Sequence, residues 1–164
     1  MRALARGFSN RKIYPMKLEE VIKSSRFAND KHKASLNILY SAYWLKDHFI
    51  AALKPHGISM EQHNVMRILK GSHPDRMRVK DIAARMVEKS SNVPRILDKL
   101  EPKGLTTRTA SESDKRETFV SLTESGIVLI ENARKSIDEI TEKILHINDE
   151  DAITLNNILE KMRG

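Results

Sequence analysis

The chain has 164 residues, a formal net charge of +7 and no cysteine. This length fits one compact domain, or a small domain with an oligomerisation element, and 40% hydrophobic residues suffice for an ordinary core. Without cysteine, disulfides, thiol switches and cysteine-ligated zinc are excluded. No stretch approaches the roughly 20 apolar residues of a membrane helix, so we expect a cytoplasmic protein with no membrane partner.

The positive charge is concentrated in two segments. Residues 1–33 carry nine basic and three acidic side chains, and residues 76–116 carry eleven and six, whereas residues 117–164 carry five and ten. A polyanion would be attracted to the first two segments. The alternative is that Lys and Arg merely keep the surface soluble, and charge alone does not exclude it.

The N-terminal third is predicted to contain an extension and a long helix. Residues 1–33 show little periodicity and form the basic extension, in which Met16 reads as an alternative start. The helix is predicted over residues 34–53, because Pro55 and Gly57 end its apolar pattern.

A second helix is predicted from Ser59 to about Lys70. Ser59 and Gln62 have the spacing of a capping box, in which each side chain bonds to the backbone of the other residue. Residues 77–79 are predicted to be a very short strand or an extended segment.

Two short helices follow in the order of a helix-turn-helix. The first covers residues 79–87, and the second covers residues 91–101, with Ser90 or Ser91 as its cap and Pro94 in its first turn. Each has apolar residues at i, i+3, i+4 and i+7, which gives it one apolar face. These residues are Val79, Ile82, Ala83 and Met86, then Val93, Ile96, Leu97 and Leu100.

A β-hairpin is predicted next. Its strands, residues 105–111 and 118–122, are rich in Thr and Val and flank the polar segment 112–117. Thr123 is the expected cap of a long helix that follows.

The C-terminal helices carry the apolar spacing of a packed interface. Apolar residues recur in steps of three and four from Ile130 to Ile147, which is the spacing of a seam between helices. A last helix is expected after Asn148 or Asp149. The candidate dimer-interface residues are Ile130, Ile137, Ile140, Ile144, Leu155 and Ile158.

Three motifs resemble those of a known family. The segment from Ser90 to Leu105 ends in Leu-Glu-x-x-Gly-Leu, residues 114–116 read Asp-Lys-Arg, and residues 120–126 end in Leu-Thr-x-x-Gly. In this order they resemble the MarR family of bacterial transcriptional regulators, over residues 34–162.

The resemblance implies a mainly α fold with a small β-hairpin wing, in which N- and C-terminal dimerisation helices flank a winged helix-turn-helix core. The expected parts are a basic N-terminal extension (1–33), a first dimerisation helix (34–57), the winged helix-turn-helix DNA-binding domain (58–122) and the C-terminal dimerisation helices (123–164).

The resemblance also implies a function. Family members are homodimers that place one helix in the major groove and the wing along the minor groove, and many repress an operon until a small molecule releases them. We therefore expect a sequence-specific regulator, a repressor, that binds double-stranded DNA at a pseudo-palindromic operator. Two residues depart from the family pattern: Arg78, where Ser or Thr often caps a helix, and Pro94, where a small polar residue often contacts DNA.

The exposed side of residues 91–101 supplies the first candidate DNA contacts. Arg95 can donate two hydrogen bonds to guanine, and Asn92 can pair with adenine. Ser90, Ser91 and Lys99 are assigned to phosphates, although helix capping explains Ser91 at least as well.

The wing supplies the second group. Arg116 is expected to enter the minor groove and Lys115 to contact the adjoining phosphate, with a solvated turn as the alternative. Further phosphate candidates, for which an exposed charged face is nearly as good an explanation, are Arg76, Arg78, Lys80 and Arg108.

An aromatic or anionic effector is the expected ligand, because the resemblance implies a pocket between the first helices and the DNA-binding part. Aromatic groups of this kind more often pack in a core or a dimer interface. The candidate effector residues are Tyr40, Tyr43, Trp44, His48, His63 and Met66.

The sequence also bears on three other functions. An enzyme is not expected, because the sequence has no His-Glu-x-x-His, no Gly-x-Ser-x-Gly and no glycine-rich phosphate loop, so no catalytic residue and no cofactor are assigned. A metal-responsive regulator of the same fold is an alternative, but no two of the six histidines are spaced i, i+4, and no metal ligand is assigned. A winged helix that binds another protein is the third possibility.

Overall fold

The computed structural model describes residues 16–110 and 117–164, and the chain divides into two compact units, residues 1–44 and 45–164. In the first unit α1 (Leu18–Ile22) precedes α2 (Asp30–Leu53), which continues into the second unit. An ion pair between Lys33 and Glu19 joins the two helices.

The long N-terminal helix begins four residues earlier than predicted. The Asn29 side chain accepts a hydrogen bond from the backbone nitrogen of His32 at 2.9 Å, which satisfies one free donor of the first turn and allows the helix to begin at Asp30. The C-terminal end agrees with the prediction, since a 3₁₀ turn and the left-handed Gly57 follow Leu53.

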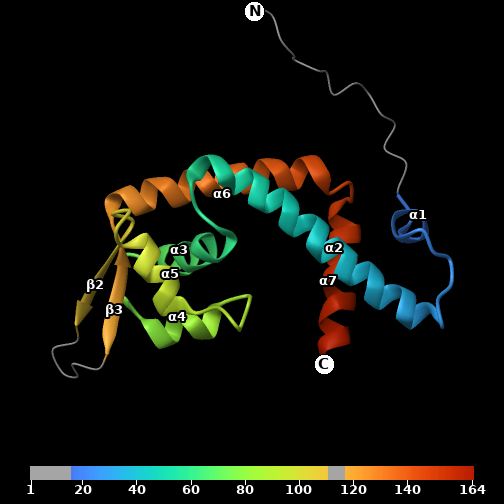
Figure 1. The fold of residues 1–164 in the computed structure, drawn as a ribbon, viewed down its shortest axis with the longest axis horizontal. Coiled ribbons are helices and arrows are strands. Elements are labelled where there is room, and N and C mark those ends of the chain that lie inside the picture. Colours follow the sequence, from blue (N-terminus) through green and yellow to red (C-terminus); the bar gives the residue numbers. More distant parts are fainter. Residues whose placement is uncertain (1–15, 111–116) are drawn as a thin grey trace, which may run out of the picture. The chain divides into compact units, whose positions relative to one another are not determined.

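The second unit is a winged helix with two long C-terminal helices (Figure 1). Its elements are η1 (Lys54–His56), α3 (Met60–Ser72), β1 (Met77–Arg78), α4 (Val79–Arg85), α5 (Val93–Leu100), β2 (Thr106–Ala110), β3 (Thr118–Leu122), α6 (Glu124–Ile144) and α7 (Asp149–Arg163). The sheet is antiparallel in the order β1-β3-β2, with Arg78 opposite Phe119 and Thr106 opposite Leu122. The predicted fold class, mainly α with a small hairpin wing, is confirmed.

Side-chain caps define where most of these helices begin. Ser59 and Gln62 form the predicted capping box at α3, and Thr123 caps α6 by accepting a hydrogen bond from the backbone nitrogen of Gly126 at 3.0 Å. Asn148 caps α7 in the same way. Arg78 occupies the cap position of α4 and makes no capping bond with its side chain, as its departure from the family pattern implied.

The cap of α5 differs from the prediction. Asn92, not Ser90 or Ser91, accepts the hydrogen bond from the backbone nitrogen of Arg95, at 3.2 Å. The helix consequently begins at Val93, and Pro94 lies in the first turn, where its missing donor has no intrahelical partner to lose.

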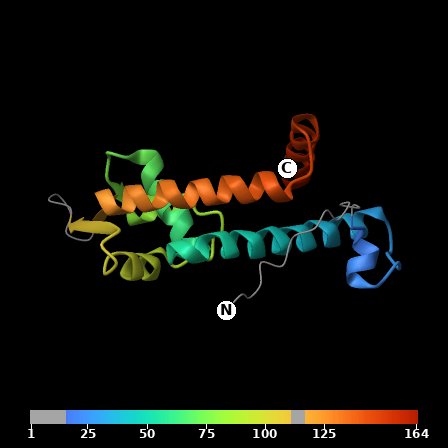
Figure 2. The ribbon, with the colours of Figure 1, turned by 90° about the horizontal axis from the view of Figure 1, so that it is seen from above.

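The core lies between α3, α4, α5, the sheet and the first half of α6. Met66, Ile82, Leu97 and Leu100 are fully buried, and α3 lies between α5 and α6 and contacts both (Figure 2). Burying each such side chain contributes about 1.5–3 kcal/mol to folding. The helices α3 and α4 therefore hold α5 on a rigid base.

The seam predicted on α6 is divided between two environments. Ile130 is only 3% exposed and belongs to the core of its own chain, so its assignment to a dimer interface is corrected: its apolar spacing reflects packing against α3. Ile137 packs against the same core, whereas Ile140 and Ile144 are half-buried.

The last helix keeps its apolar side chains in solvent. The exposed large apolar residues of α7 are Ile153, Leu155, Ile158 and Met162, and two more, Leu145 and Ile147, lie in the segment before the helix. Within residues 16–110 and 117–164, no helix has both the length and the apolarity that crossing a bilayer requires.

Candidate nucleic-acid interface

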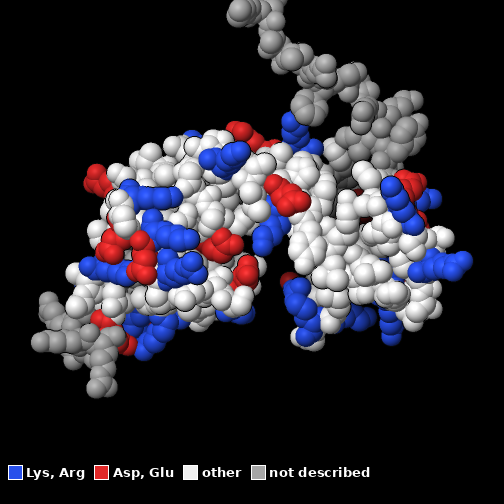
Figure 3. Space-filling model, in the orientation of Figure 1, with Lys and Arg blue, Asp and Glu red and all other residues white. Residues whose placement is uncertain are grey.

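Helix α5 has one buried and one solvent-facing side. Val93, Leu97 and Leu100 point into the core, whereas Arg95 and Lys99 are exposed. On the face drawn in Figure 3, basic side chains gather over the winged helix, with acidic side chains among them. Because its apolar side is packed in the core, α5 holds the exposed cations Arg95 and Lys99 in fixed positions on the surface.

Of the two predicted base-reading residues, Arg95 is the one whose side chain is not engaged within the described residues. Among the described residues, its guanidinium has no hydrogen-bond or ion-pair partner, and only its backbone nitrogen is engaged, by the Asn92 cap. Its five donors are therefore available for the paired acceptors on guanine.

Asn92 is less suited to the predicted role. Pairing with adenine uses the side-chain oxygen and nitrogen together, and in this structure the oxygen already accepts the capping bond. Reading adenine would therefore compete with the start of α5.

Ser90 and Ser91, the two serines before α5, do not cap the helix, and their hydroxyls have different environments. Ser90 donates a hydrogen bond to Glu88 at 3.3 Å, whereas the Ser91 hydroxyl is buried and has no partner among the described residues. A buried hydroxyl does not reach a phosphate, so the predicted phosphate contact of Ser91 is corrected.

Glu61, in the first turn of α3, is a residue that the sequence interpretation missed. It lines the same recess of about 580 Å³ as Arg95 and Lys99. The hydrogen bond that it accepts from the Ser59 hydroxyl at 2.7 Å holds the pKa of its carboxyl below the ordinary value, and Lys46 and Lys99 act in the same direction. An ionised carboxylate thus lies beside the candidate DNA contacts. Its position depends on how α3 packs on α5, which the local sequence does not reveal.

Arg108 on β2 holds the hairpin against α5 instead of facing solvent. One terminal nitrogen of its guanidinium donates to the Asp98 carboxylate at 2.7 Å and to the Pro94 carbonyl at 3.0 Å, and its Nε lies 3.7 Å from Glu101. The predicted phosphate contact of Arg108 stays a prediction, for a side chain that is already engaged within the described residues. Asp98 lies on α5 and Glu101 directly follows the helix, so Arg108 fixes the angle between α5 and the wing strand.

A second group of charges joins β1 and α4 to Glu117, the residue directly before β3. Glu117 accepts hydrogen bonds from Lys80 at 2.6 Å and from Arg78 at 3.4 Å. Arg78 also donates to Asp81 at 2.9 Å, and this bond is the main reason that its pKa lies above the ordinary value. Both predicted phosphate candidates are therefore paired, although Lys80 remains 63% exposed.

The remaining basic candidates have different positions. Arg76 lies over the ring of Phe119, 5.2 Å from its centroid. Lys115 and Arg116, the predicted wing contacts, fall outside the described residues.

The candidate effector residues do not share one environment. Met66 is fully buried in the core, so its assignment to an effector is corrected. His63 is half-buried and lines a recess between α3 and α6. In the first unit Tyr40 and Tyr43 are exposed and Trp44 is half-buried, and His48 in the second unit is half-buried. No three His, Asp or Glu side chains in the described part of the chain gather as metal ligands do.

Two of the three sequence motifs, the one that ends at Leu105 and the one over residues 120–126, meet at the base of the wing, and residues 114–116 lie outside the described residues. Thr123 donates a hydrogen bond to the Gly104 carbonyl at 2.6 Å, and its backbone nitrogen donates to the Leu105 carbonyl at 3.2 Å. That carbonyl lies directly against Gly126, where a Cβ would collide with it. The end of α5, the hairpin and the start of α6 are thus locked together by residues of the motifs.

Comparisons with known proteins agree with this geometry. Residues 58–118 match the MarR family. The chain is 29% identical over 121 residues to the HTH-type transcriptional regulator MhqR of Bacillus subtilis. The aligned region covers 72% of this chain and 81% of MhqR.

Solved structures give the same result. A putative MarR-like transcription regulator from Bacillus cereus shares the fold, with a TM-score of 0.72 at 19% identity over 82% of this chain and 96% of that one. The Staphylococcus aureus MepR–DNA complex has a TM-score of 0.70 at 26% identity over 78% and 94%. The chain belongs to the MarR family of winged helix-turn-helix transcriptional regulators.

Proposed function

We propose that this protein is a transcriptional repressor that binds a pseudo-palindromic DNA operator as a homodimer. The observation that carries the proposal is the placement of Arg95: its guanidinium is exposed and unpaired among the described residues, on a helix that the core and Arg108 hold in place. The similarity to MepR, which was solved bound to DNA, supports the same role for α5.

The apolar side chains of α7 support the homodimer. Ile153 and Ile158 are 62% and 59% exposed, and an isolated chain gains nothing from leaving such residues in water. In the dimer that we propose, the two copies of α5 meet half-sites centred about 10–10.5 base pairs apart, one turn of the duplex.

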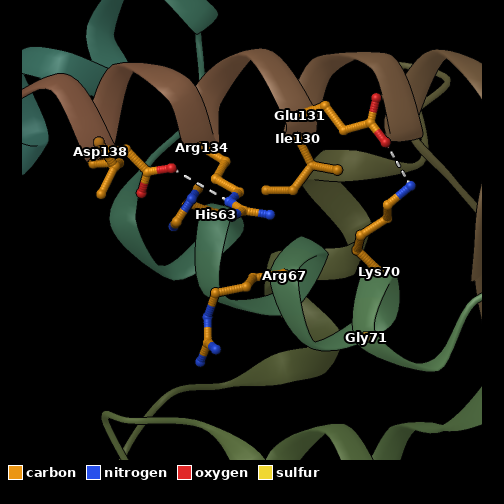
Figure 4. A pocket seen from close by; sticks show the side chains of 9 residues that line it. His63, Arg67, Lys70, Gly71, Ile130, Glu131, Arg134 and Asp138 are labelled. Atoms are coloured by element: carbon orange, nitrogen blue, oxygen red, sulfur yellow. Dashed lines mark hydrogen bonds and ion pairs between the residues drawn. The ribbon is translucent and has the colours of Figure 1, made fainter.

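Release by a small molecule completes the proposal. The recess beside His63 is lined by residues of α3, in the winged helix, and of α6, the long C-terminal helix, so a bound molecule would contact both helices (Figure 4). An aromatic or anionic effector is the class that we propose.

The test is DNA binding measured against salt, with fragments upstream of the protein's own gene and with random DNA of equal length. A protein that neutralises several phosphates should lose affinity by orders of magnitude between about 50 and 200 mM salt, and the specific fragment should retain a protected footprint. Salt-independent retention, or equal affinity for both DNAs, contradicts the proposal.

A further inference from the structure

The first turn of α5 presents two exposed side chains, and they differ in chemistry. Over residues 93–96, Val93 is buried and Ile96 is half-buried, whereas Pro94 and Arg95 are exposed. In helix-turn-helix proteins the N-terminal residues of this helix are the ones that contact base edges in the major groove. Pro94 and Arg95 therefore lie in the part of the helix that reads the sequence of a duplex.

The backbone of this turn has few donors left for a phosphate. The nitrogen of Arg95 donates to the Asn92 side chain at 3.2 Å, and Pro94 has no N–H. Two of the donors through which a helix N-terminus commonly binds phosphate are thus missing. At this end, α5 meets a duplex mainly through side chains.

The ring of Pro94 has a fixed position. Arg108 on β2 donates to the Pro94 carbonyl at 3.0 Å and to the Asp98 carboxylate, one helical turn further along the same side, at 2.7 Å. The carbonyl bond ties the backbone at Pro94 to the wing strand, and the second bond pairs the charge of Asp98. A proline side chain also loses almost no conformational entropy when it is buried. The ring is therefore ready to pack against a partner.

The chemistry of the ring selects the partner. A proline ring neither donates nor accepts a hydrogen bond. In the major groove thymine presents its C5-methyl group, an apolar feature that the other three bases lack, and apolar side chains contact it. Packing the ring on the hydrogen-bonding groups of another base would leave those groups without partners, which is costly.

We propose that Pro94 selects thymine at a base pair neighbouring the guanine that Arg95 reads. The ring packs on the thymine methyl group, and the guanidinium of the adjacent residue donates to the guanine. This inference rests on the proposed function and adds a base preference that Arg95 alone does not give.

Deoxyuridine in place of thymine tests the contact with the natural protein, because this replacement removes the methyl group and keeps the base pair. In the footprinted operator each thymine of a half-site is replaced in turn, and fluorescence anisotropy with the full chain measures the affinity. We expect a loss of about fourfold per half-site at one position, the factor that burying one methyl-sized group implies.

Variants assign that position to a residue. Pro94→Ser removes the apolar ring and should bind the thymine and deoxyuridine operators equally, while its affinity for random DNA stays unchanged and shows that it is folded. The control is Pro102→Ser, which replaces an exposed proline beyond the other end of α5 and should keep the preference for thymine. A preference that persists in Pro94→Ser, or one that is lost equally in both variants, overturns the assignment.

The same titrations separate this inference from the proposed function. Specific operator binding without any position that depends on the methyl group refutes the role of Pro94 alone. A protein that does not distinguish the operator from random DNA refutes both.

Discussion

Two arginines of the winged helix show how one residue type takes different roles. Arg95 is exposed and unpaired among the described residues, whereas Arg108 is held by two acidic side chains and a carbonyl of α5. The sequence predicts a DNA contact for both: Arg95 lies on the exposed side of the helix predicted over residues 91–101, and Arg108 is a further phosphate candidate in the basic segment 76–116. Only the packing of β2 on α5 separates a DNA-facing arginine from one that fixes the wing strand.

Replacing Arg95 should affect sequence discrimination. Arg95→Ala removes a donor pair that is worth about 1–3 kcal/mol of preference for guanine, so the ratio of operator to random-DNA affinity should fall about tenfold or more. Fluorescence anisotropy with both DNAs measures the ratio. The control Lys99→Ala should weaken binding to both DNAs about equally, and an unchanged ratio in Arg95→Ala would refute the role of Arg95.

Replacing Arg108 should affect stability through its carboxylate partner. Because Asp98 is 62% exposed, we expect a coupling of at most about 1 kcal/mol between Arg108→Ala and Asp98→Ala. Urea unfolding of the two single variants and the double variant measures this coupling. Additive effects of the two substitutions would show that the interaction of Arg108 with Asp98 contributes nothing measurable to stability.

At the scale of elements, order and type were predictable and some boundaries were not. The apolar spacing of residues 79–101 and the Ser59–Gln62 box identify the helices because these signals are local. The cap at Asn92 and the position of Glu61 were missed, since three adjacent polar residues compete for one cap and the approach of α3 to α5 is a tertiary contact.

The junction between hairpin and α6 should tolerate no side chain. In Gly126→Ala the added methyl group would collide with the Leu105 carbonyl oxygen, and overpacking of this kind costs about 1–3 kcal/mol or more. Urea unfolding should show this loss. The matched control is Gly71→Ala in α3, which meets no atom within 4 Å and should be neutral or stabilising. Equal effects of the two substitutions would contradict the close approach.

His63, on α3, should make the stability of the protein depend on pH. Because burial holds the pKa of His63 below its ordinary value of 6.5, the unfolded chain binds this proton at a higher pH than the folded one. Well above pH 6.5, His63 is neutral in both the folded and the unfolded chain and does not make stability depend on pH. As the pH falls below about 6.5, the unfolded chain takes up the proton first and the folded state loses stability.

The comparison of variants isolates this effect. His63→Gln should lose less unfolding free energy than the natural protein between about pH 7.5 and about pH 5.5, measured in urea. The exposed His73→Gln is the control and should behave like the natural protein. An unchanged pH dependence in His63→Gln would exclude His63 as its source.

For the whole molecule, the exposed apolar face of α7 predicts assembly. Replacing Leu155 and Ile158 together with Lys should yield monomers in analytical ultracentrifugation, because burying two ammonium groups in an apolar interface is costly. Asn157→Lys on the same helix tests whether added charge alone has this effect, since Asn157 is already polar and exposed. A dimer that persists in the double variant would contradict an interface at this face.

The direct connection of β3 to α6 through Thr123 has a mechanical consequence. At about 1.5 Å per residue, the 21 residues of α6 form a rod ~31 Å long, and a tilt of about 5° displaces its far end by ~3 Å. The hydrogen bonds of Thr123 and the contact at Gly126 leave little play at the near end, so the wing and the rod turn together. A small rotation at the far end of α6 would thereby alter the distance between the two α5 helices of a dimer by roughly the spacing of one base pair, about 3.4 Å.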